Sequence, residues 1–274
     1  MGPEEWQSAV RTVQMSHGEA AFAEFGRGEP VVLLHGVGFV QGGHDWFCNV
    51  EALARDFRVI APDLVGWGAG TRLRQGYSFA RLVDFLRELQ DRLDIPRSHV
   101  VGHSMGGWIA SLFAYESPQR VNRLVLVGAG GAATRPLPMM TEFQPPSLDD
   151  VVASLSARAG GDEQTLRRWA EYAFGKVQEP EALASYRRIL AHMSDPETRT
   201  AYNMLRRYPY LEAETLAVWG RDDRINALEL GEQVARSIPR AALTVLECGH
   251  FPHSERPEEF NRRVAAFLGE GRTD

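Results

Sequence analysis

Residues 98–108 read SHVVGHSMGGW, and this stretch decides the fold of the chain. A short apolar run rich in valine leads into residues 102–106, which have the pattern G-x-S-x-G. A tight turn from a buried strand into a helix exposes the central serine hydroxyl, and the helix N-terminus favours negative charge beside it. The stretch therefore predicts a strand, a nucleophile turn at Ser104 and a helix over residues 105–115.

Similar apolar runs recur on both sides of this stretch. They are continuous and do not alternate with polar residues, which is typical of strands buried on both faces. Residues 77–95 place apolar side chains three and four apart, as in an amphipathic helix. The alternation of strands and helices predicts a mostly parallel sheet covered by helices, with an added edge hairpin. The apolar runs are residues 31–34, 59–61, 99–101, 124–127, 216–219 and 243–246, and the hairpin strands are residues 11–15 and 20–25.

The pattern breaks between residues 133 and 210. No convincing strand occurs there, and proline-rich connectors lead into helical patterns, the first of which begins with Ser147 as its N-cap. The sheet pattern resumes at residue 216. We therefore expect one α/β core made of residues 1–132 and 211–274, with residues 133–210 inserted as a helical lid.

Composition excludes several classes of protein. The chain has 274 residues, of which 44% are hydrophobic and 24% are charged, as in an ordinary globular protein. Acidic residues outnumber basic ones by 36 to 30, and the net charge of -6 is opposite to that of a general nucleic-acid binder. No apolar run approaches the length of a membrane span, and residues 1–6 do not resemble a signal peptide. The two cysteines, Cys48 and Cys248, fit free thiols in a reducing compartment, so we expect a cytoplasmic protein.

Five motifs in a fixed order carry a family resemblance. They are HGVG at residues 35–38, DLVGWG at 63–68, GHSMGG at 102–107, WGRDD at 219–223 and CGH at 248–250. With these motifs the chain resembles the α/β-hydrolases over nearly its whole length. The resemblance implies the α/β-hydrolase fold, with a mostly parallel central sheet flanked by helices and an inserted helical lid.

The resemblance also implies a catalytic triad. A serine hydroxyl needs a base within hydrogen-bond reach, and the base needs an acid that orients it. The family order is serine, aspartate, histidine, which selects Ser104, Asp223 and His250 in this chain. Asp223 is preferred to its neighbour Asp222 because it is the third residue after the strand-ending glycine. His253 is expected to be a rim residue.

The resemblance places the oxyanion hole as well. Its donors are expected to be the backbone N–H groups of Met105, just after the nucleophile, and of Val37, in the loop after the HG pair. Gly36 and Gly38 form the tight turn of that loop and are expected near the substrate. His103, inside the nucleophile motif, is expected to pack beside the site.

The lid suggests a substrate class. The extended loop of residues 35–49 and the lid pattern of residues 179–188 resemble those of the meta-cleavage product hydrolases, which cut a carbon–carbon bond in vinylogous diketones. In those enzymes a lid arginine binds the carboxylate end of the substrate, and Arg187 is the matching residue, although it also fits a solvated helix face. Phe251 stands where they have tryptophan. An esterase or lactonase acting on an apolar substrate fits the sequence equally well.

The sequence leaves the role of the lid aromatics and the reaction class open. Four aromatics either line the substrate pocket or form a small core of the lid: Phe143, Trp169, Tyr172 and Phe174. A cofactor-free oxygenase, an acyltransferase or a non-catalytic ligand receptor on the same fold is the alternative to a serine hydrolase. The triad mechanism requires no metal and no organic cofactor. We expect a small-molecule substrate as the partner, and a homo-oligomer is compatible with the sequence.

Overall fold

Eight strands form a single sheet in the computed structural model, which describes residues 1–73, 76–133, 136 and 138–270. The strand order is β1-β2-β4-β3-β5-β6-β7-β8. Strands β3 to β8 pair in parallel, and β1 and β2 add an antiparallel edge. The predicted strands and the predicted edge hairpin are therefore confirmed. The strands are β1 (Val10–Met15), β2 (Gly18–Phe25), β3 (Glu29–Leu34), β4 (Phe57–Pro62), β5 (Ser98–His103), β6 (Val121–Val127), β7 (Glu214–Gly220) and β8 (Ala241–Leu246).

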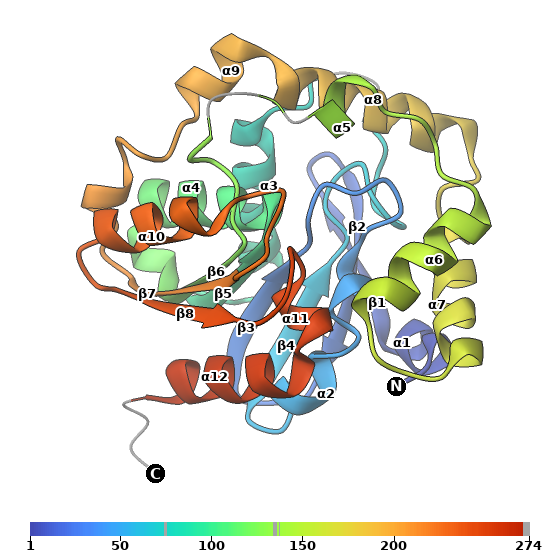
Figure 1. Cartoon of the computed structure of the whole chain (residues 1–274), viewed down its shortest axis with the longest axis horizontal. Helices are drawn as coiled ribbons and strands as arrows, with labels where there is room; N and C mark the ends of the chain where they lie inside the picture. Colours follow the sequence, from blue (N-terminus) through green and yellow to red (C-terminus); the bar gives the residue numbers. More distant parts are fainter. Residues whose placement is uncertain (74–75, 134–135, 137, 271–274) are drawn as a thin grey trace.

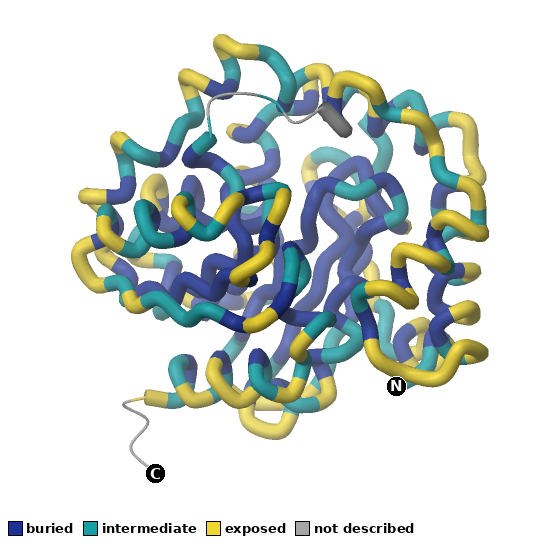
Figure 2. The backbone as a smooth tube through the Cα atoms, in the orientation of Figure 1, coloured by how far each residue is buried: buried dark blue, intermediate teal, exposed yellow. Residues whose placement is uncertain are grey.

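Both faces of the central strands are buried. In β3, Val31 and Leu33 belong to one apolar cluster, whereas Val32 and Leu34 belong to the cluster on the opposite face. This is why the apolar runs in the sequence are continuous, since successive side chains of a strand point to opposite faces. Figure 2 shows the buried strands at the centre of the molecule and the exposed positions on its outer helices.

Helices cover both faces of the sheet. Contacts between elements place α3, α4 and α10 on one face, and α2 and α12 on the other. Helix α3 fills the segment predicted from its apolar stripe, and its first turn is capped by Ser78. The helices outside the segment between β6 and β7 are α1 (Pro3–Ala9), α2 (Val50–Leu53), α3 (Phe79–Arg92), α4 (Met105–Glu116), α10 (Leu228–Ser237), α11 (Pro252–Glu255) and α12 (Pro257–Gly269), with 3₁₀ turns η1 (Gly43–Trp46) and η2 (Pro118–Arg120).

The chain between β6 and β7 carries helices and no strand wherever the structure describes it. In Figure 1, α8 and α9 run across the top of the molecule and α6 and α7 lie at its right. The predicted cap at Ser147 is present, because its hydroxyl accepts the N–H of Asp150 over 3.2 Å. Prolines start α8 and α9, as fits a residue without an N–H group. These elements are α5 (Pro138–Thr141), α6 (Leu148–Arg158), α7 (Glu163–Gly175), α8 (Pro180–Ser194), α9 (Pro196–Ala201) and η3 (Tyr208–Tyr210).

The described residues contain no helix that is both long and apolar enough to cross a membrane. The parallel strands β3, β4, β5, β7 and β8 all end at the same edge of the sheet, which is the usual edge for a ligand site in an open α/β sheet. The motifs identified in the sequence follow these strand ends, so the fold brings them together.

Candidate active site

Ser104 is the single residue between β5 and α4. Its backbone has a φ of 52° and a ψ of -113°, and a positive φ costs free energy in a residue with a Cβ. Two hydrogen bonds hold this conformation: the N–H of Ser104 donates to the carbonyl of Val127, and the carbonyl of Ser104 accepts the N–H of Gly130, both over 2.9 Å. The neighbouring strand β6 and the loop after it therefore keep Ser104 in the predicted nucleophile turn.

The glycines of the motif allow this turn to form. A Cβ on Gly102 would lie 2.3 Å from the carbonyl oxygen of Gly106, and a Cβ on Gly106 would lie 2.4 Å from that of Leu34. Both distances are far shorter than a van der Waals contact, so only glycine fits. The G-x-S-x-G pattern thus reflects the close approach of α4 to β5 and to the end of β3.

His250 and Asp223 form a buried pair beside this turn. The Nδ1 atom of His250 lies 2.8 Å from Oδ2 of Asp223, whose side chain is fully buried. The other carboxylate oxygen accepts the N–H groups of Ile225 and Asn226 over 2.8 and 2.9 Å. With Nδ1 donating to Asp223, the Nε2 atom of His250 is free to accept a proton. Asp222 is exposed, so the geometry selects Asp223 as the partner.

The loop that carries His250 is held from two sides. Glu255 of α11 accepts the N–H of Gly249 over 2.8 Å and the N–H of Phe251 over 2.9 Å, so one carboxylate holds both neighbours of the histidine. On the other side, Nε2 of His103 donates to the carbonyl of His250 over 2.9 Å. Burial holds the pKa of His103 well below its usual range, which keeps its ring neutral. These contacts fix the backbone position of His250.

The loop after β3 is oriented by His35. The N–H of Leu64 donates to Nε2 of His35 over 3.1 Å, so the ring proton is on Nδ1, which donates to the carbonyl of Gly36 over 2.8 Å. Burial lowers the pKa of His35 and keeps this neutral tautomer. Because the C=O and N–H of a trans peptide point in opposite directions, the N–H of Val37 points away from the His35 ring.

One cavity of about 220 Å³ joins these elements, and most of its lining is apolar. Gly36 does not line it, and a Cβ on this residue would lie 2.8 Å from Oε1 of Gln41 and 3.0 Å from Nδ1 of His103. Asp223 does not line the cavity either and contacts His250, which does. The other predicted residues that line the cavity are Val37, Gly38, His103, Ser104, Met105, His250 and Phe251.

The structure does not bring Arg187 to this cavity. Arg187 is exposed on α8 and lines a separate open hollow of about 410 Å³. The buried positions of α8 include Tyr186, Ile189 and Leu190, and Arg187 lies off this stripe. The periodicity of the helix was the sequence signal that could have shown its outward position.

The four aromatics singled out between residues 133 and 210, namely Phe143, Trp169, Tyr172 and Phe174, also lie outside the lining of the cavity. Trp169 packs against Phe47 with ring centroids 4.7 Å apart, and Phe143 packs against Tyr186 at 4.7 Å. This packing fits the interpretation in which these aromatics form a core between the helices and the sheet domain.

Sequence reasoning missed several residues of the cavity. Gln41, Arg158 and Arg199 line it, and none of them belongs to a recognisable motif. Arg199 of α9 is buried, donates to the carbonyls of Met193 and Ala133 over 3.0 Å each, and lies over the ring of Trp108. Arginines are frequent in this sequence, and no local signal separates the buried ones from those on the surface.

Comparison with known proteins agrees with this geometry. A family model for the alpha/beta hydrolase fold matches residues 29–257. The chain belongs to this family. The predicted family and enzyme class, a hydrolase, are thereby confirmed, and the fold described above is the α/β-hydrolase fold.

Two relatives and one solved structure resemble this hydrolase over most of its length. The 2-hydroxy-6-oxo-6-phenylhexa-2,4-dienoate hydrolase of Burkholderia cepacia is 33% identical, with 90% of each chain covered. The 2-hydroxy-6-oxononadienedioate/2-hydroxy-6-oxononatrienedioate hydrolase of Cupriavidus pinatubonensis is 33% identical over 88% of this chain and 87% of its own. The meta-cleavage product hydrolase CumD of Pseudomonas fluorescens IP01 superimposes with a TM-score of 0.82 at 27% identity, covering 96% of this chain and 98% of its own. The chain is thus an α/β hydrolase similar to the meta-cleavage product hydrolases.

Proposed function

We propose that the protein is a serine hydrolase that cleaves a carbon–carbon bond beside a ketone, with Ser104 as nucleophile, His250 as base and Asp223 as the orienting acid. One observation carries the proposal: His250, held by Asp223 over 2.8 Å, lines the same cavity as Ser104 on its strained turn. Asp223 keeps the proton of His250 on Nδ1, so that Nε2 can take the proton of the serine hydroxyl.

The oxyanion hole is proposed to consist of the N–H groups of Val37 and Met105. Met105 begins α4, and its N–H belongs to the first turn of that helix, where backbone donors have no partner within the helix. The N–H of Val37 points away from His35, and Val37 lines the cavity. Two such donors stabilise the alkoxide that forms when serine attacks a carbonyl.

The reaction balances with water as the only co-reactant. Ser104 adds to the ketone carbon while His250 takes the hydroxyl proton, giving a tetrahedral alkoxide. The substrate reacts as its 2-oxo tautomer, in which the proton of the 2-hydroxyl is replaced by a proton on the carbon beside the ketone. Collapse of the alkoxide breaks the carbon–carbon bond, and the electron pair passes into the conjugated 2-oxo acid. The resulting dienolate takes the proton that His250 received from Ser104, which returns His250 to its neutral form. Water, deprotonated by His250, then hydrolyses the acyl enzyme to a carboxylic acid and restores Ser104.

The proposed substrate is a 2-hydroxy-6-oxo-dienoate. The names of the curated relatives, the largely apolar lining of the cavity and the cationic Arg199 within it support this class. Gly38, His103 and Phe251 are proposed to contact the substrate. The placement of Arg187 outside the cavity favours the second candidate, an ester or lactone without a carboxylate end.

Further parts of the proposal concern the whole molecule. Residues 133–210 are proposed to act as the lid of a core made of residues 1–132 and 211–274, since Met140, Arg158, Met193 and Arg199 of this segment line the cavity. A reducing, cytoplasmic location is supported by Cys48 and Cys248, which are both free. A homo-oligomer is compatible with this proposal.

Turnover of two substrates tests the bond that is cut. The purified enzyme is given 2-hydroxy-6-oxo-6-phenylhexa-2,4-dienoate, and loss of the conjugated absorbance is followed together with release of benzoate. A series of 4-nitrophenyl esters of increasing acyl length is the comparison. We expect the dienoate to have the higher kcat/KM. Turnover of the esters alone would reject carbon–carbon cleavage and retain the serine hydrolase.

A further inference from the structure

We propose that Arg158, the last residue of α6, is a positioning residue that fixes the oxyanion loop through Asp45 and Gln41. The oxyanion loop is the chain from Gly36 to Gly38. The proposal rests on the function proposed above, because it assigns the N–H of Val37 to the oxyanion hole. It concerns a residue of the lid segment that lies outside every catalytic motif.

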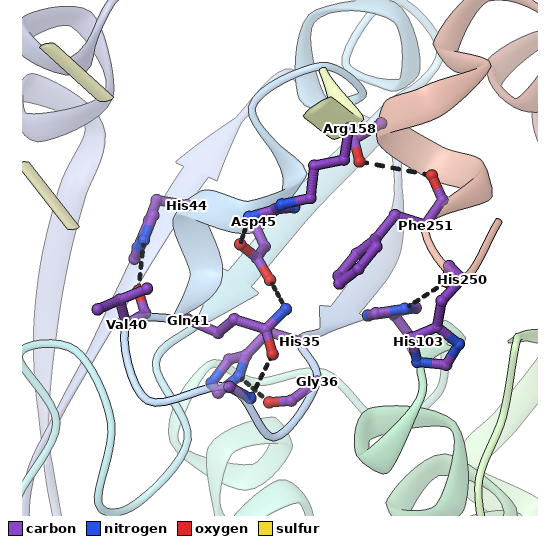
Figure 3. Close-up of polar contacts among 12 residues, drawn as sticks. His35, Gly36, Val40, Gln41, His44, Asp45, His103, Arg158, His250 and Phe251 are labelled. Carbon is purple, nitrogen blue, oxygen red and sulfur yellow. Dashed lines mark hydrogen bonds and ion pairs between the residues drawn. The ribbon is translucent and has the colours of Figure 1, made fainter. Parts of the chain in front are cut away.

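A continuous chain of contacts leads from Arg158 to the loop (Figure 3). Nη2 of Arg158 lies 3.3 Å from Oδ1 of Asp45. The other carboxylate oxygen of Asp45 accepts a hydrogen bond from Nε2 of Gln41. Oε1 of Gln41 in turn accepts the N–H of Gly38 over 2.5 Å. Each polar atom of the Gln41 amide is therefore used to connect Asp45 with the loop.

The chain of contacts is buried and charged. Asp45 is 3% exposed and Gln41 is 7% exposed. Burial alone would raise the pKa of Asp45, but the Arg158 guanidinium and three nearby histidines together outweigh burial and hold the pKa below its usual range, with Arg158 the largest of these opposing influences. The guanidinium carbon of Arg158 also lies 4.6 Å from the ring centroid of Phe251. Arg158 is thus held between the oxyanion side of the site and the loop that carries His250.

These contacts fix the peptide on one side of Val37, and His35 fixes the peptide on the other side. His35 holds the carbonyl of Gly36, while Gln41 holds the N–H of Gly38. The Gln41 side chain also packs closely on the loop, since a Cβ on Gly38 would lie 2.9 Å from its Oε1. Displacing a catalytic donor by about 1 Å can lower a rate about 100-fold, so loss of this support is expected to lower kcat.

A double-mutant cycle with Gln41→Met and Arg158→Gln tests the proposal. Gln41→Met removes the link to Gly38 and leaves the Asp45 ion pair in place. The substrate is a neutral 4-nitrophenyl ester, so that Arg158 has no substrate carboxylate to bind. We expect Gln41→Met to lower kcat by about 10-fold to 100-fold, with KM changed by less than about threefold.

The double variant decides whether Arg158 acts through Gln41. We expect Arg158→Gln to lower kcat in the wild-type background and to have no further effect in the Gln41→Met background, because residues in one network are not additive. Arg187→Gln, on the exposed face of α8, is the matched control and should leave kcat unchanged. The proposal would be overturned if the double variant lowered kcat by the product of the two single-variant factors. It would also be overturned if Gln41→Met had the kcat of the wild type.

Folding is controlled separately. Arg158→Gln leaves the buried Asp45 carboxylate without its cation, so Arg158→Lys, which keeps the charge, is measured beside it, and the unfolding temperature of every variant is recorded. Lower unfolding temperatures with unchanged kcat per folded enzyme would assign a purely structural role and overturn the proposal. Ester turnover that is abolished by Ser104→Ala tests Ser104 as the nucleophile independently of the cycle, so failure of the proposed function can be told apart from failure of this proposal.

Discussion

His253 gives this hydrolase a defined sensitivity to acid. The prediction that His253 lies at the rim of the site is wrong, because its ring is fully buried against Trp46 and His103, with ring centroids 4.6 and 4.5 Å away. Neither ring nitrogen has a hydrogen-bond partner among the described residues. Burial lowers the pKa of His253 to about 3, against an ordinary value of 6.5. The unfolded chain therefore binds a proton below pH 6.5 that the folded chain does not bind. The stability that depends on this neutral ring is present above pH 6.5 and is lost as the pH falls towards 3.

The magnitude follows from the two pKa values. Between pH 7.5 and pH 5, protonation of this one histidine in the unfolded chain lowers the free energy of unfolding by about 2 kcal/mol. His253→Phe fills a similar volume and removes the titrating group. From pH 7.5 to pH 5 we therefore expect the wild type to lose about 2 kcal/mol more of its free energy of unfolding than the variant loses.

Guanidinium unfolding at pH 7.5 and pH 5, followed by tryptophan fluorescence, measures this difference. His17→Gln, at a partly exposed histidine in the turn between β1 and β2, is the control and should reproduce the wild-type loss of stability. An equal loss in His253→Phe and in the wild type would refute the reasoning, because another group would then be responsible for the acid sensitivity.

Two further predictions concern the backbone around the site. Glu255→Ala removes the acceptor for the N–H groups of Gly249 and Phe251, so kcat for the 4-nitrophenyl ester should fall about 10-fold or more. Glu255→Gln keeps one acceptor oxygen and should retain more activity in the same assay. Gly106→Ala should lower the free energy of unfolding by more than about 3 kcal/mol, because the new Cβ would meet a backbone carbonyl oxygen at 2.4 Å. Gly175→Ala, at the end of α7, is the matched control, since no atom lies within 4 Å of its Cβ. Chemical unfolding should show this variant to be neutral or stabilised by up to about 1 kcal/mol. Equal effects of the two glycine substitutions would contradict the packing described for the nucleophile turn.

Local sequence patterns predicted the sheet and the nucleophile turn because their causes are local. A buried parallel strand needs apolar residues on both faces, so β3 and β6 appear as continuous apolar runs. The turn at Ser104 needs glycines where α4 approaches the strands, so it appears as a short motif. The family resemblance also selected Asp223 as the partner of His250, because the family pattern places the aspartate three residues after the strand-ending glycine.

Contacts between distant segments could not be predicted in this way. Asp45 and Arg158 are 113 positions apart, and their ion pair depends on how α6 packs beside the segment that carries η1. Helix α1 was not expected, since it has only seven residues and is fixed by the packing of Trp6 against Trp169 and Phe25. The family resemblance selected Arg187 as the arginine that binds the substrate carboxylate. Its side chain lies outside the cavity, because the direction of a helical side chain depends on which face of the helix is buried.

The most direct test of the proposed function is the reaction of Ser104 with an active-site label. A fluorophosphonate is added to the wild type and to Ser104→Ala, the labelled residue is found by peptide mass spectrometry, and turnover of the dienoate is measured in parallel. We expect one label per wild-type chain, on Ser104, and turnover in Ser104→Ala lowered by about 1000-fold or more. Full turnover by Ser104→Ala, or labelling of a different residue, would contradict the assignment of Ser104 as the nucleophile.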